Sequence, residues 1–244
     1  MDLVGKTALV TGGAQRVGAE IVRTLARAGA LVYLHHHRST REAERLARSL
    51  ELERARVIPL QADLTHVNEI DALFDRIGAA GQGLDILVGN AARYVRASLE
   101  QTALSTWDNV MAINLKAPFW CARRAAPLML SRGGGVIVHV ADLAGERAWP
   151  NHAAYSCSQA ALLSLTRTLA LELAPRIRVN AVAPGAVLWP DDMPEPTRKR
   201  LQARIPLERV GEPRDVAAAV RFLIENDFLT GETIRVDGGR GIVP

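Results

Sequence analysis

Residues 7–18 read TALVTGGAQRVG, and this stretch decides the fold. A short apolar run leads into two adjacent glycines, and an amphipathic run from Val17 to Ala28 begins just before a third glycine. Glycines allow a sharp turn that brings backbone N–H groups close to a phosphate, and a helix N-terminus favours negative charge. The stretch therefore predicts a strand, a pyrophosphate-binding turn and a helix. The alternative is an ordinary strand-to-helix turn with incidental glycines.

Outward from this turn, short apolar runs alternate with amphipathic runs along the chain. Strands are predicted at Thr7–Thr11, Leu31–His35, Arg56–Gln61, Ile86–Gly89, Val136–Val140, Arg178–Ala183 and Thr233–Val236. Helices are predicted most clearly at Val17–Ala28, Arg41–Leu52, Glu69–Ile77, Ala154–Leu173 and Arg214–Ile224. Because parallel strands are joined by right-handed helical crossovers, we expect an α/β fold. It would be a Rossmann-type, doubly wound, mainly parallel seven-stranded sheet with helices on both faces, in a single domain over residues 1–244.

One Pro-rich segment, Pro184–Pro196, follows a predicted strand and is too polar and too broken to form an element. Loops in such positions commonly carry function. We expect a substrate-covering loop at about residues 186–205.

Composition narrows the class of protein. The chain is 48% hydrophobic and 23% charged, which is typical of a globular protein with a substantial core. Its net charge is +4, but the arginines of residues 41–54 alternate with glutamates, which indicates a solvated helix face. We therefore expect no nucleic-acid partner. No apolar run approaches the roughly 18 residues of a membrane helix, so we expect no membrane partner either.

The cellular compartment is predicted from the N-terminus and the cysteines. A strand pattern begins within a few residues of Met1 and leaves no room for a signal peptide. Cys121 and Cys157 lie among apolar or small residues and have no C-x-x-C partner. We expect reduced core thiols and a cytoplasmic protein.

Residues 35–39, at the end of the second predicted strand, read HHHRS. Enzymes that use NAD place a carboxylate here on the ribose 2′-hydroxyl, and a carboxylate would repel a 2′-phosphate. Arg38 could instead bind that phosphate bidentately, with His37 and Ser39 as further donors. Arg16 adds a guanidinium to the phosphate turn. The pattern predicts NADPH/NADP as the cofactor, with a solvated loop and a metal site as alternatives. Consecutive strand residues point to opposite faces, which disfavours the metal.

Several motifs together resemble the short-chain dehydrogenase/reductase family along essentially the whole chain. They are Thr11-Gly12-x3-Arg16-x-Gly18, Asp63-Leu64, Asn90-Ala91-Ala92, Asn114, Tyr155 and Pro184-Gly185. The arginine in the glycine turn, the HHHRS run and the Asp-Asp-Met-Pro of residues 191–194 resemble the pteridine reductases of that family. Those enzymes use NADPH to reduce biopterin-type or folate-type rings.

The resemblance implies roles for individual residues. The cofactor would contact Gly12, Arg16, Val17, Gly18, His37, Arg38, Ser39, Asp63, Leu64, Asn90, Ala91, Tyr155, Gln159, Pro184 and Gly185. Tyr94 falls where pteridine reductases place an aromatic ring that stacks on the pterin, and a loop aromatic that packs on its own scaffold is the alternative.

The family also implies a catalytic set, from which this chain departs twice. Asn114 and Tyr155 fit the pattern, with Tyr155 as the general acid. Asp142 stands thirteen positions before Tyr155, where most relatives have serine. Pteridine reductases share this Asp, whose carboxyl helps the tyrosine protonate a ring nitrogen. Gln159 replaces the lysine that would lower the pKa of the tyrosine and bind the ribose.

Three hypotheses follow for function. The protein is an NADPH-dependent reductase of pterin or folate rings, a reductase of another carbonyl or imine substrate, or an NADPH-binding protein with little activity. Asp142 and Tyr94 favour the first hypothesis, and Gln159 favours the third. The resemblance also implies a homo-oligomer, a dimer or a tetramer, formed through residues 154–173 and the C-terminal segment.

Overall fold

The protein is described by a computed structural model that covers residues 1–189 and 193–243. Its centre is a seven-stranded parallel sheet in the order β3-β2-β1-β4-β5-β6-β7. The strands are β1 (Thr7–Val10), β2 (Leu31–His36), β3 (Arg56–Gln61), β4 (Ile86–Gly89), β5 (Gly135–Val140), β6 (Ile177–Pro184) and β7 (Thr233–Val236). The predicted doubly wound sheet is confirmed.

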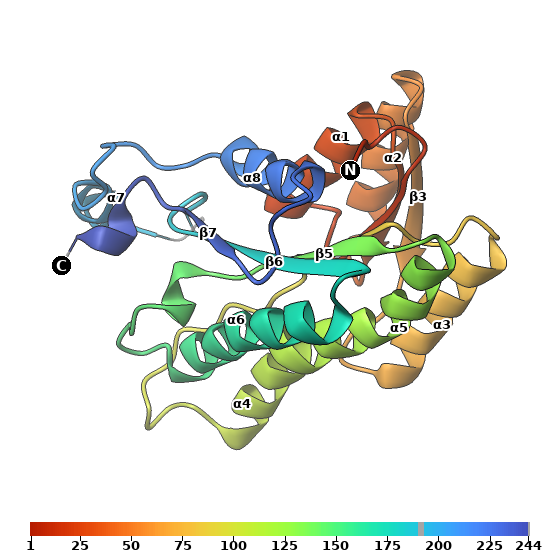
Figure 1. The fold of residues 1–244 in the computed structure, drawn as a ribbon. Coiled ribbons are helices and arrows are strands. Elements are labelled where there is room, and N and C mark those ends of the chain that lie inside the picture. The colour runs from red at the N-terminus through yellow and green to blue at the C-terminus, as the bar shows by residue number, and fades with distance from the viewer. Residues whose placement is uncertain (190–192, 244) are drawn as a thin grey trace.

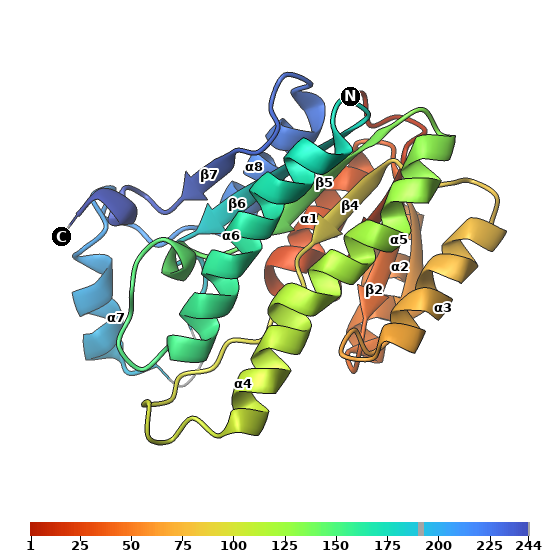
Figure 2. The same cartoon turned by 60° about the horizontal axis from the view of Figure 1, so that its bottom comes forward.

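Helices cover both faces of this sheet. One face carries α1 (Arg16–Arg27), α2 (Thr40–Leu52) and α8 (Pro213–Glu225), and the other carries α3 (Val67–Ala79), α4 (Leu104–Met111), α5 (Ala117–Ser131) and α6 (Ala153–Leu173) (Figures 1 and 2). The helix α7 (Glu195–Gln202) lies near the C-terminal end of the chain. A π turn at Ala112–Lys116 joins α4 to α5, and short 3-10 turns lie at Leu143–Gly145 and Arg240–Ile242.

Strand β1 shows how the sequence forms two cores. Its side chains alternate between the faces of the sheet, since successive strand residues point in opposite directions. Ala8 and Val10 pack in the core beneath α1 and α8, whereas Leu9 packs in the core beneath α3 and α5. Because β1 has a hydrophobic core on each side, its side chains from Ala8 to Val10 are apolar on both faces and show no polar alternation.

Three helices, α4, α5 and α7, are missing from the set predicted most clearly, and a physical reason is evident for α5 and α7. Pro127 lies inside α5 and interrupts its apparent helical pattern, yet α5 buries one face against α3 and the sheet. Helix α7 lies inside the segment predicted as the loop 186–205. It buries no side chain, so it has no apolar periodicity to reveal it. Asp191 and Asp192 of the Asp-Asp-Met-Pro motif fall outside the described residues.

The prediction for the cysteines was half right. Cys121 is buried in α5, and burial raises the pKa of its thiol to about 12. Cys157 is exposed on α6, so the prediction of a core thiol at this position was wrong. Small neighbours such as Ser156 and Ser158 do not distinguish a buried from an exposed helix position. In the part of the chain that the structure describes, no helix is both long and apolar enough to cross a bilayer.

Candidate active site

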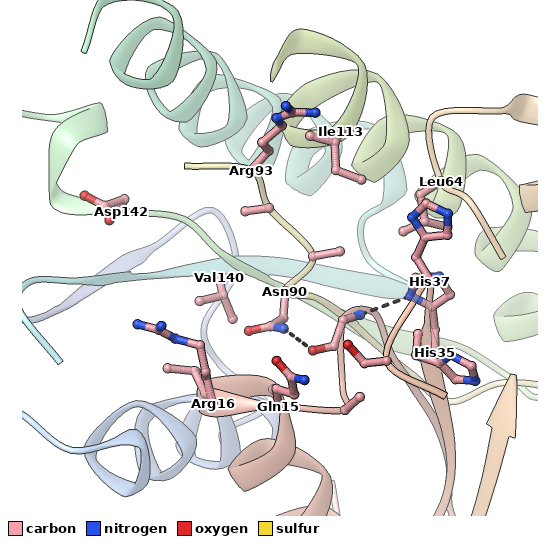
Figure 3. A pocket seen from close by; sticks show the side chains of 18 of the residues that line it. Gln15, Arg16, His35, His37, Leu64, Asn90, Arg93, Ile113, Val140 and Asp142 are labelled. Atoms are coloured by element: carbon pink, nitrogen blue, oxygen red, sulfur yellow. Dashed lines mark hydrogen bonds between the residues drawn. The ribbon is translucent and has the colours of Figure 1, made fainter. Parts of the chain in front are cut away.

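A cleft of about 720 Å³ opens at the carboxyl ends of the strands, where the sheet order reverses between β1 and β4. Crevices at this point of a doubly wound sheet are the usual ligand sites. Most residues predicted for the site line the cleft (Figure 3). They are Gly12, Arg16, Val17, Gly18, His37, Arg38, Ser39, Asp63, Leu64, Asn90, Ala91, Asp142, Tyr155, Pro184 and Gly185.

The phosphate turn is held by the ends of three strands. Gly12 donates its N–H to His35 Nδ1 at 3.0 Å. His35 Nε2 therefore carries the ring proton and donates to the Ala62 carbonyl at 3.0 Å. Burial lowers the pKa of His35 to about 4, which keeps the ring neutral in this bridging role. From the other side, Asn90 Nδ2 donates to the carbonyls of Thr11 and Gly12 at 2.9 and 3.0 Å.

This turn fits a pyrophosphate. Gly12 has φ +62°, and a Cβ at Gly18 would lie 2.2 Å from the Gly12 carbonyl oxygen. Helix α1 begins at Arg16, and its first turn has no side-chain cap. Its leading N–H groups therefore remain available to an anion beside the cleft. Gly12, Val17, Gly18 and their neighbours could hold the phosphates of a dinucleotide.

Arg16 lies on the other side of the cleft from the HHHRS run. It adopts φ +53°, and its side chain extends on the side where Val140 and Asp142 lie, away from His37 (Figure 3). The left-handed backbone, which the sequence does not reveal, sets this direction. In this conformation Arg16 lies apart from His37, and its predicted role at the cofactor phosphates stays a prediction.

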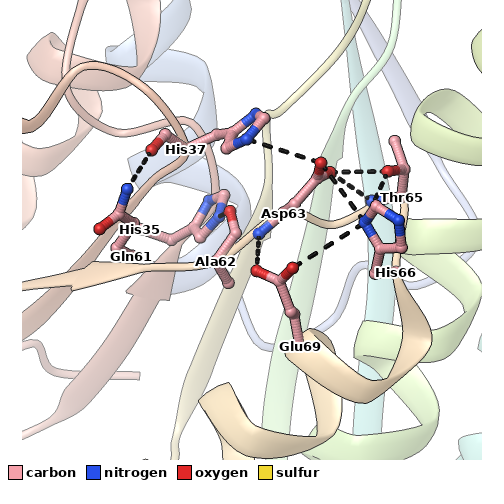
Figure 4. A network of polar contacts seen from close by, with 8 residues as sticks. All are labelled: His35, His37, Gln61, Ala62, Asp63, Thr65, His66 and Glu69. Atoms are coloured by element: carbon pink, nitrogen blue, oxygen red, sulfur yellow. Dashed lines mark hydrogen bonds and ion pairs between the residues drawn. The ribbon is translucent and has the colours of Figure 1, made fainter.

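His37 belongs to a polar network at the opposite end of the cleft (Figure 4). Its Nε2 lies 3.5 Å from Asp63 Oδ2, and His66 Nδ1 lies 3.4 Å from the same oxygen. Asp63 Oδ1 accepts the N–H and O–H of Thr65 at 2.9 and 2.7 Å. Burial opposes ionisation of Asp63, but the Thr65 hydrogen bonds and the two imidazoles lower its pKa below the usual range. Asp63 thus orders His37, and no group of three potential metal ligands forms among the described residues.

At the part of the cleft that Asp142 lines, two side chains are joined by a hydrogen bond. The Tyr155 hydroxyl donates to Asp142 Oδ2 at 2.9 Å, and Asp142 Oδ1 accepts the N–H of Ala144 at 2.7 Å. Burial raises the pKa of Asp142 to about 6. Burial and the Asp142 carboxylate raise the pKa of Tyr155 well above its usual value. Tyr155 is therefore a stable hydroxyl, and Asp142 is the group that titrates near neutral pH.

The loop of Asp142 is fixed against α6. A Cβ at Gly145 would lie 2.8 Å from the Gln159 backbone carbon, so this loop and α6 approach more closely than any side chain allows. Gln159 itself is 1% exposed, and its Oε1 has no hydrogen-bond partner among the described residues. Gln159 lies behind the cleft wall, one helical turn from Tyr155. Gln159 does not line the cleft in this structure, and its contact with the cofactor ribose stays a prediction.

Asn114 also lies behind the wall, in the π turn. Its Oδ1 accepts the Arg93 N–H at 2.8 Å, and its Nδ2 donates to the Arg93 carbonyl and to Ser158 Oγ at 3.1 and 2.9 Å. Ser158 Oγ in turn donates to the Tyr155 carbonyl at 2.7 Å. Asn114 does not line the cleft. It holds the Arg93 backbone and, through Ser158, contacts the Tyr155 backbone, and its place in the catalytic set stays a prediction.

Tyr94 lies beside the pair. Its ring meets the Tyr155 ring edge-on, with centroids 5.0 Å apart and planes at 74°. Its hydroxyl lies 2.7 Å from His152 Nε2. Arg93, Ser158 and His152 were not predicted, because their roles depend on contacts between distant segments. The one usable signal was the position of His152 and Ser158 one turn before and one turn after Tyr155.

Comparison with known proteins agrees with this geometry. The family model described as Enoyl-(Acyl carrier protein) reductase matches residues 12–240. The chain is 36% identical over 251 residues to 3beta-hydroxysteroid dehydrogenase 1 of Eggerthella lenta, covering 100% of this chain and 96% of the relative. It is 33% identical over 239 residues to 3-oxoacyl-[acyl-carrier-protein] reductase FabG of Staphylococcus aureus, covering 96% and 97%.

Among solved structures, FolM alternative dihydrofolate reductase 1 of Brucella canis, complexed with NADP, superposes with a TM-score of 0.93. It is 32% identical in sequence, and the match covers 100% of this chain and 96% of that one. These relatives share the sheet and extend over nearly the full length of the chain. The chain therefore belongs to the short-chain dehydrogenase/reductase family and is an NAD(P)-dependent oxidoreductase.

Proposed function

We propose that this protein is an NADPH-dependent reductase of pterin-type or folate-type rings. The observation that carries the proposal is the hydrogen bond from the Tyr155 hydroxyl to Asp142 Oδ2 at 2.9 Å inside the cleft. In pteridine reductases, which the sequence resembles, such a pair protonates a ring nitrogen, whereas short-chain reductases of ketones typically have a serine at the position of Asp142. The likeness to the Brucella canis FolM structure, a dihydrofolate reductase by its name, supports the same substrate class.

The pair moves a proton in the following way. When Asp142 is ionised, its carboxylate accepts a hydrogen bond from the Tyr155 hydroxyl, so the hydroxyl proton points away from the substrate. When Asp142 is protonated, its O–H donates to the Tyr155 oxygen, and the Tyr155 proton is free to pass to a ring nitrogen. The pKa of Asp142, raised to about 6 by burial, makes this protonated state accessible near neutral pH. Bound NADPH would supply the hydride.

The choice of NADPH rests on the residues that directly follow strand β2. Arg38 and Ser39 line the cleft beside His37, which Asp63 orders at 3.5 Å. Arginine is the side chain best suited to bidentate phosphate binding. We propose that Arg38 holds the 2′-phosphate, with His37 and Ser39 as further donors.

A second candidate follows from Gln159, which provides no charge beside Tyr155. A protein that binds NADPH and reduces slowly, or one that acts on another carbonyl or imine, would also fit this site. The relatives include a steroid dehydrogenase and an oxoacyl carrier-protein reductase by name, so carbonyl substrates belong in the test.

The discriminating experiment is NADPH oxidation by the full-length protein against dihydrobiopterin, dihydrofolate, a quinone and an acetoacetyl thioester. We expect turnover with one or both pterin-type substrates and the slowest turnover with the thioester. Turnover of the thioester or quinone alone would contradict the proposed substrate class. Binding of NADPH without turnover of any substrate would favour the second candidate.

We also propose a homo-oligomer, because large apolar side chains remain exposed on the helices of one face. Phe119 of α5 and Leu171 of α6 are 42% and 83% exposed. Light scattering of the purified protein tests this, and a monomer at micromolar concentration would contradict it.

A further inference from the structure

A chain of hydrogen bonds leads away from the site through Tyr94 and His152. His152 Nδ1 lies 2.7 Å from the Pro150 carbonyl oxygen, which can only accept a hydrogen bond. Nδ1 therefore carries a proton in every protonation state of the ring. In the neutral ring, Nε2 is then the acceptor, and it accepts the Tyr94 hydroxyl at 2.7 Å. The surroundings thus fix the tautomer of His152.

Tyr94 and His152 both lie close to Tyr155. His152 is 9% exposed and directly precedes α6, and its carbonyl accepts the N–H of Ser156 at 2.7 Å. It therefore lies one helical turn before Tyr155. The Tyr94 ring contacts the Tyr155 ring edge-on at 5.0 Å and remains 53% exposed, so one side of it is open.

Among the described residues, two charged groups act on the Tyr94 hydroxyl. Burial raises the pKa of Tyr94, Arg96 opposes that shift, and Asp142 adds to it. Tyr94 consequently stays a hydroxyl at neutral pH. Trp149 packs edge-on against the His152 ring with centroids 5.7 Å apart and carries no titratable group. Histidine is the side chain whose charge changes near neutral pH.

We propose that Tyr94 and His152 form a second proton-transfer pair beside Asp142 and Tyr155, with His152 positioning the Tyr94 hydroxyl. This inference rests on the proposed reduction at the site. It assigns a role to two residues that reach Tyr155 through the edge-on contact of the Tyr94 ring, and it places beside the pair a histidine, whereas Gln159 carries no charge.

The orientation of the Tyr94 hydroxyl depends on the state of His152. When the His152 ring is neutral, the Tyr94 hydroxyl donates its proton in a hydrogen bond to Nε2. The Tyr94 oxygen can then offer only its lone pairs to a substrate. With a protonated ring, Nε2–H donates to the Tyr94 oxygen, and the Tyr94 O–H turns outward as a donor. One proton then passes from Tyr94 to the substrate while the Nε2 proton passes to the Tyr94 oxygen. His152 ends neutral and regains its proton from solvent, so no proton is gained or lost within the pair.

The test measures kcat and KM of the full-length enzyme from pH 5 to 9 in four forms. These are wild type, His152→Gln, Tyr94→Phe and the control Trp149→Phe. Gln keeps a hydrogen-bonding amide but does not titrate, and Phe keeps the ring packing but removes the hydroxyl. We expect His152→Gln and Tyr94→Phe each to lower kcat about 10-fold to 100-fold, with KM changed less than threefold. Each should also remove one ionisation from the pH profile of kcat. The control should keep the wild-type profile.

A purely structural role predicts something different. Thermal unfolding of His152→Gln would then shift while the shape of its pH profile stays as in wild type, and that result overturns the proposal. The combined variant should be no slower than the slower single variant, because the two residues act as one unit.

The pH profiles are recorded with whichever of dihydrobiopterin, dihydrofolate, the quinone and the acetoacetyl thioester the enzyme reduces. The test of the proton-transfer pair therefore does not depend on the proposed substrate class. If none turns over, the proposed reductase function fails on its own. The nitrogen NMR spectrum of the His152 ring then decides the pairing. Tyr94→Phe should move the Nε2 resonance, since that nitrogen loses its hydrogen-bond partner. An unchanged Nε2 resonance would overturn the pairing.

Discussion

The Tyr155 hydroxyl donates its hydrogen bond to Asp142 Oδ2 at 2.9 Å, and this contact joins the end of β5 to the first turn of α6. It places a half-buried carboxyl with a raised pKa directly beside the tyrosine, at the wall of the cleft. The more acidic member of the pair is therefore Asp142.

The raised pKa of Asp142 has a consequence for stability. A folded-state pKa near 6, against 3.8 for the free side chain, means that the folded protein binds the proton more tightly than the unfolded chain. This contribution to stability is full below pH 4 and is lost as pH rises to about 6. Asp142→Asn should thus leave the free energy of unfolding nearly unchanged at about pH 3.5 and raise it by roughly 2–3 kcal/mol at about pH 8. Urea unfolding at both pH values checks this, and equal effects at the two would contradict the assignment.

Gln159→Lys should restore the charge that the family pattern has beside the tyrosine. A cation about 4 Å from a phenol lowers its pKa by up to about 3 units at an intermediate dielectric. We expect higher turnover and a pH profile shifted to lower pH, measured by NADPH oxidation. Tyr155→Phe in the same background should abolish turnover. An unchanged profile in Gln159→Lys would mean that another group already performs this role, as Tyr94 and His152 are proposed to do.

Arg38→Asp should change cofactor choice without changing the fold. Loss of a charge-assisted phosphate contact and introduction of a repelling carboxylate should weaken NADPH about 10-fold to 100-fold. NADH has no 2′-phosphate, so its affinity should stay the same or improve. Fluorescence titration of both cofactors measures this. Arg45→Asp is the matched control, since Arg45 is an exposed arginine of α2 that does not line the cleft. Equal losses for NADPH and NADH would contradict the role of Arg38.

Gly18→Ala should disrupt the phosphate turn. The new methyl group would lie 2.2 Å from the Gly12 carbonyl oxygen and 2.6 Å from Asn90 Nδ2, and neither neighbour can move without opening the turn. We expect a cost of roughly 1–3 kcal/mol in stability and a cofactor affinity at least tenfold lower in titration. Gly78→Ala is the control, because its nearest neighbour is a leucine methyl at 3.6 Å. Comparable losses of stability and cofactor affinity in both variants would contradict a phosphate-binding role for the turn.

The sequence predicted the parts of the fold that depend on local pattern. The strand-turn-helix at residues 7–18 and the apolar strands are all present, because short buried strands have a strong local signature. Helix α5 was missed because Pro127 interrupts its pattern, while its burial against α3 is decided by tertiary packing.

The pair of Asp142 and Tyr155 was predicted from the family resemblance rather than from a local pattern, and the structure brings the two side chains together. The direction of the Arg16 side chain was not predictable, because its left-handed backbone is not visible in sequence. The contact between Tyr94 and His152 joins segments 58 positions apart through a loop that has no local pattern.

The account depends most on Asp142 as the acid that supplies the proton through Tyr155. The most direct test is the pH dependence of kcat/KM for NADPH-dependent reduction of a dihydropterin, from pH 5 to 8, in wild type and Asp142→Asn. We predict that the wild-type value falls as pH rises through about 6, and that the variant is at least 100-fold slower with this ionisation absent. A variant that keeps the wild-type rate and the same inflection would contradict the account.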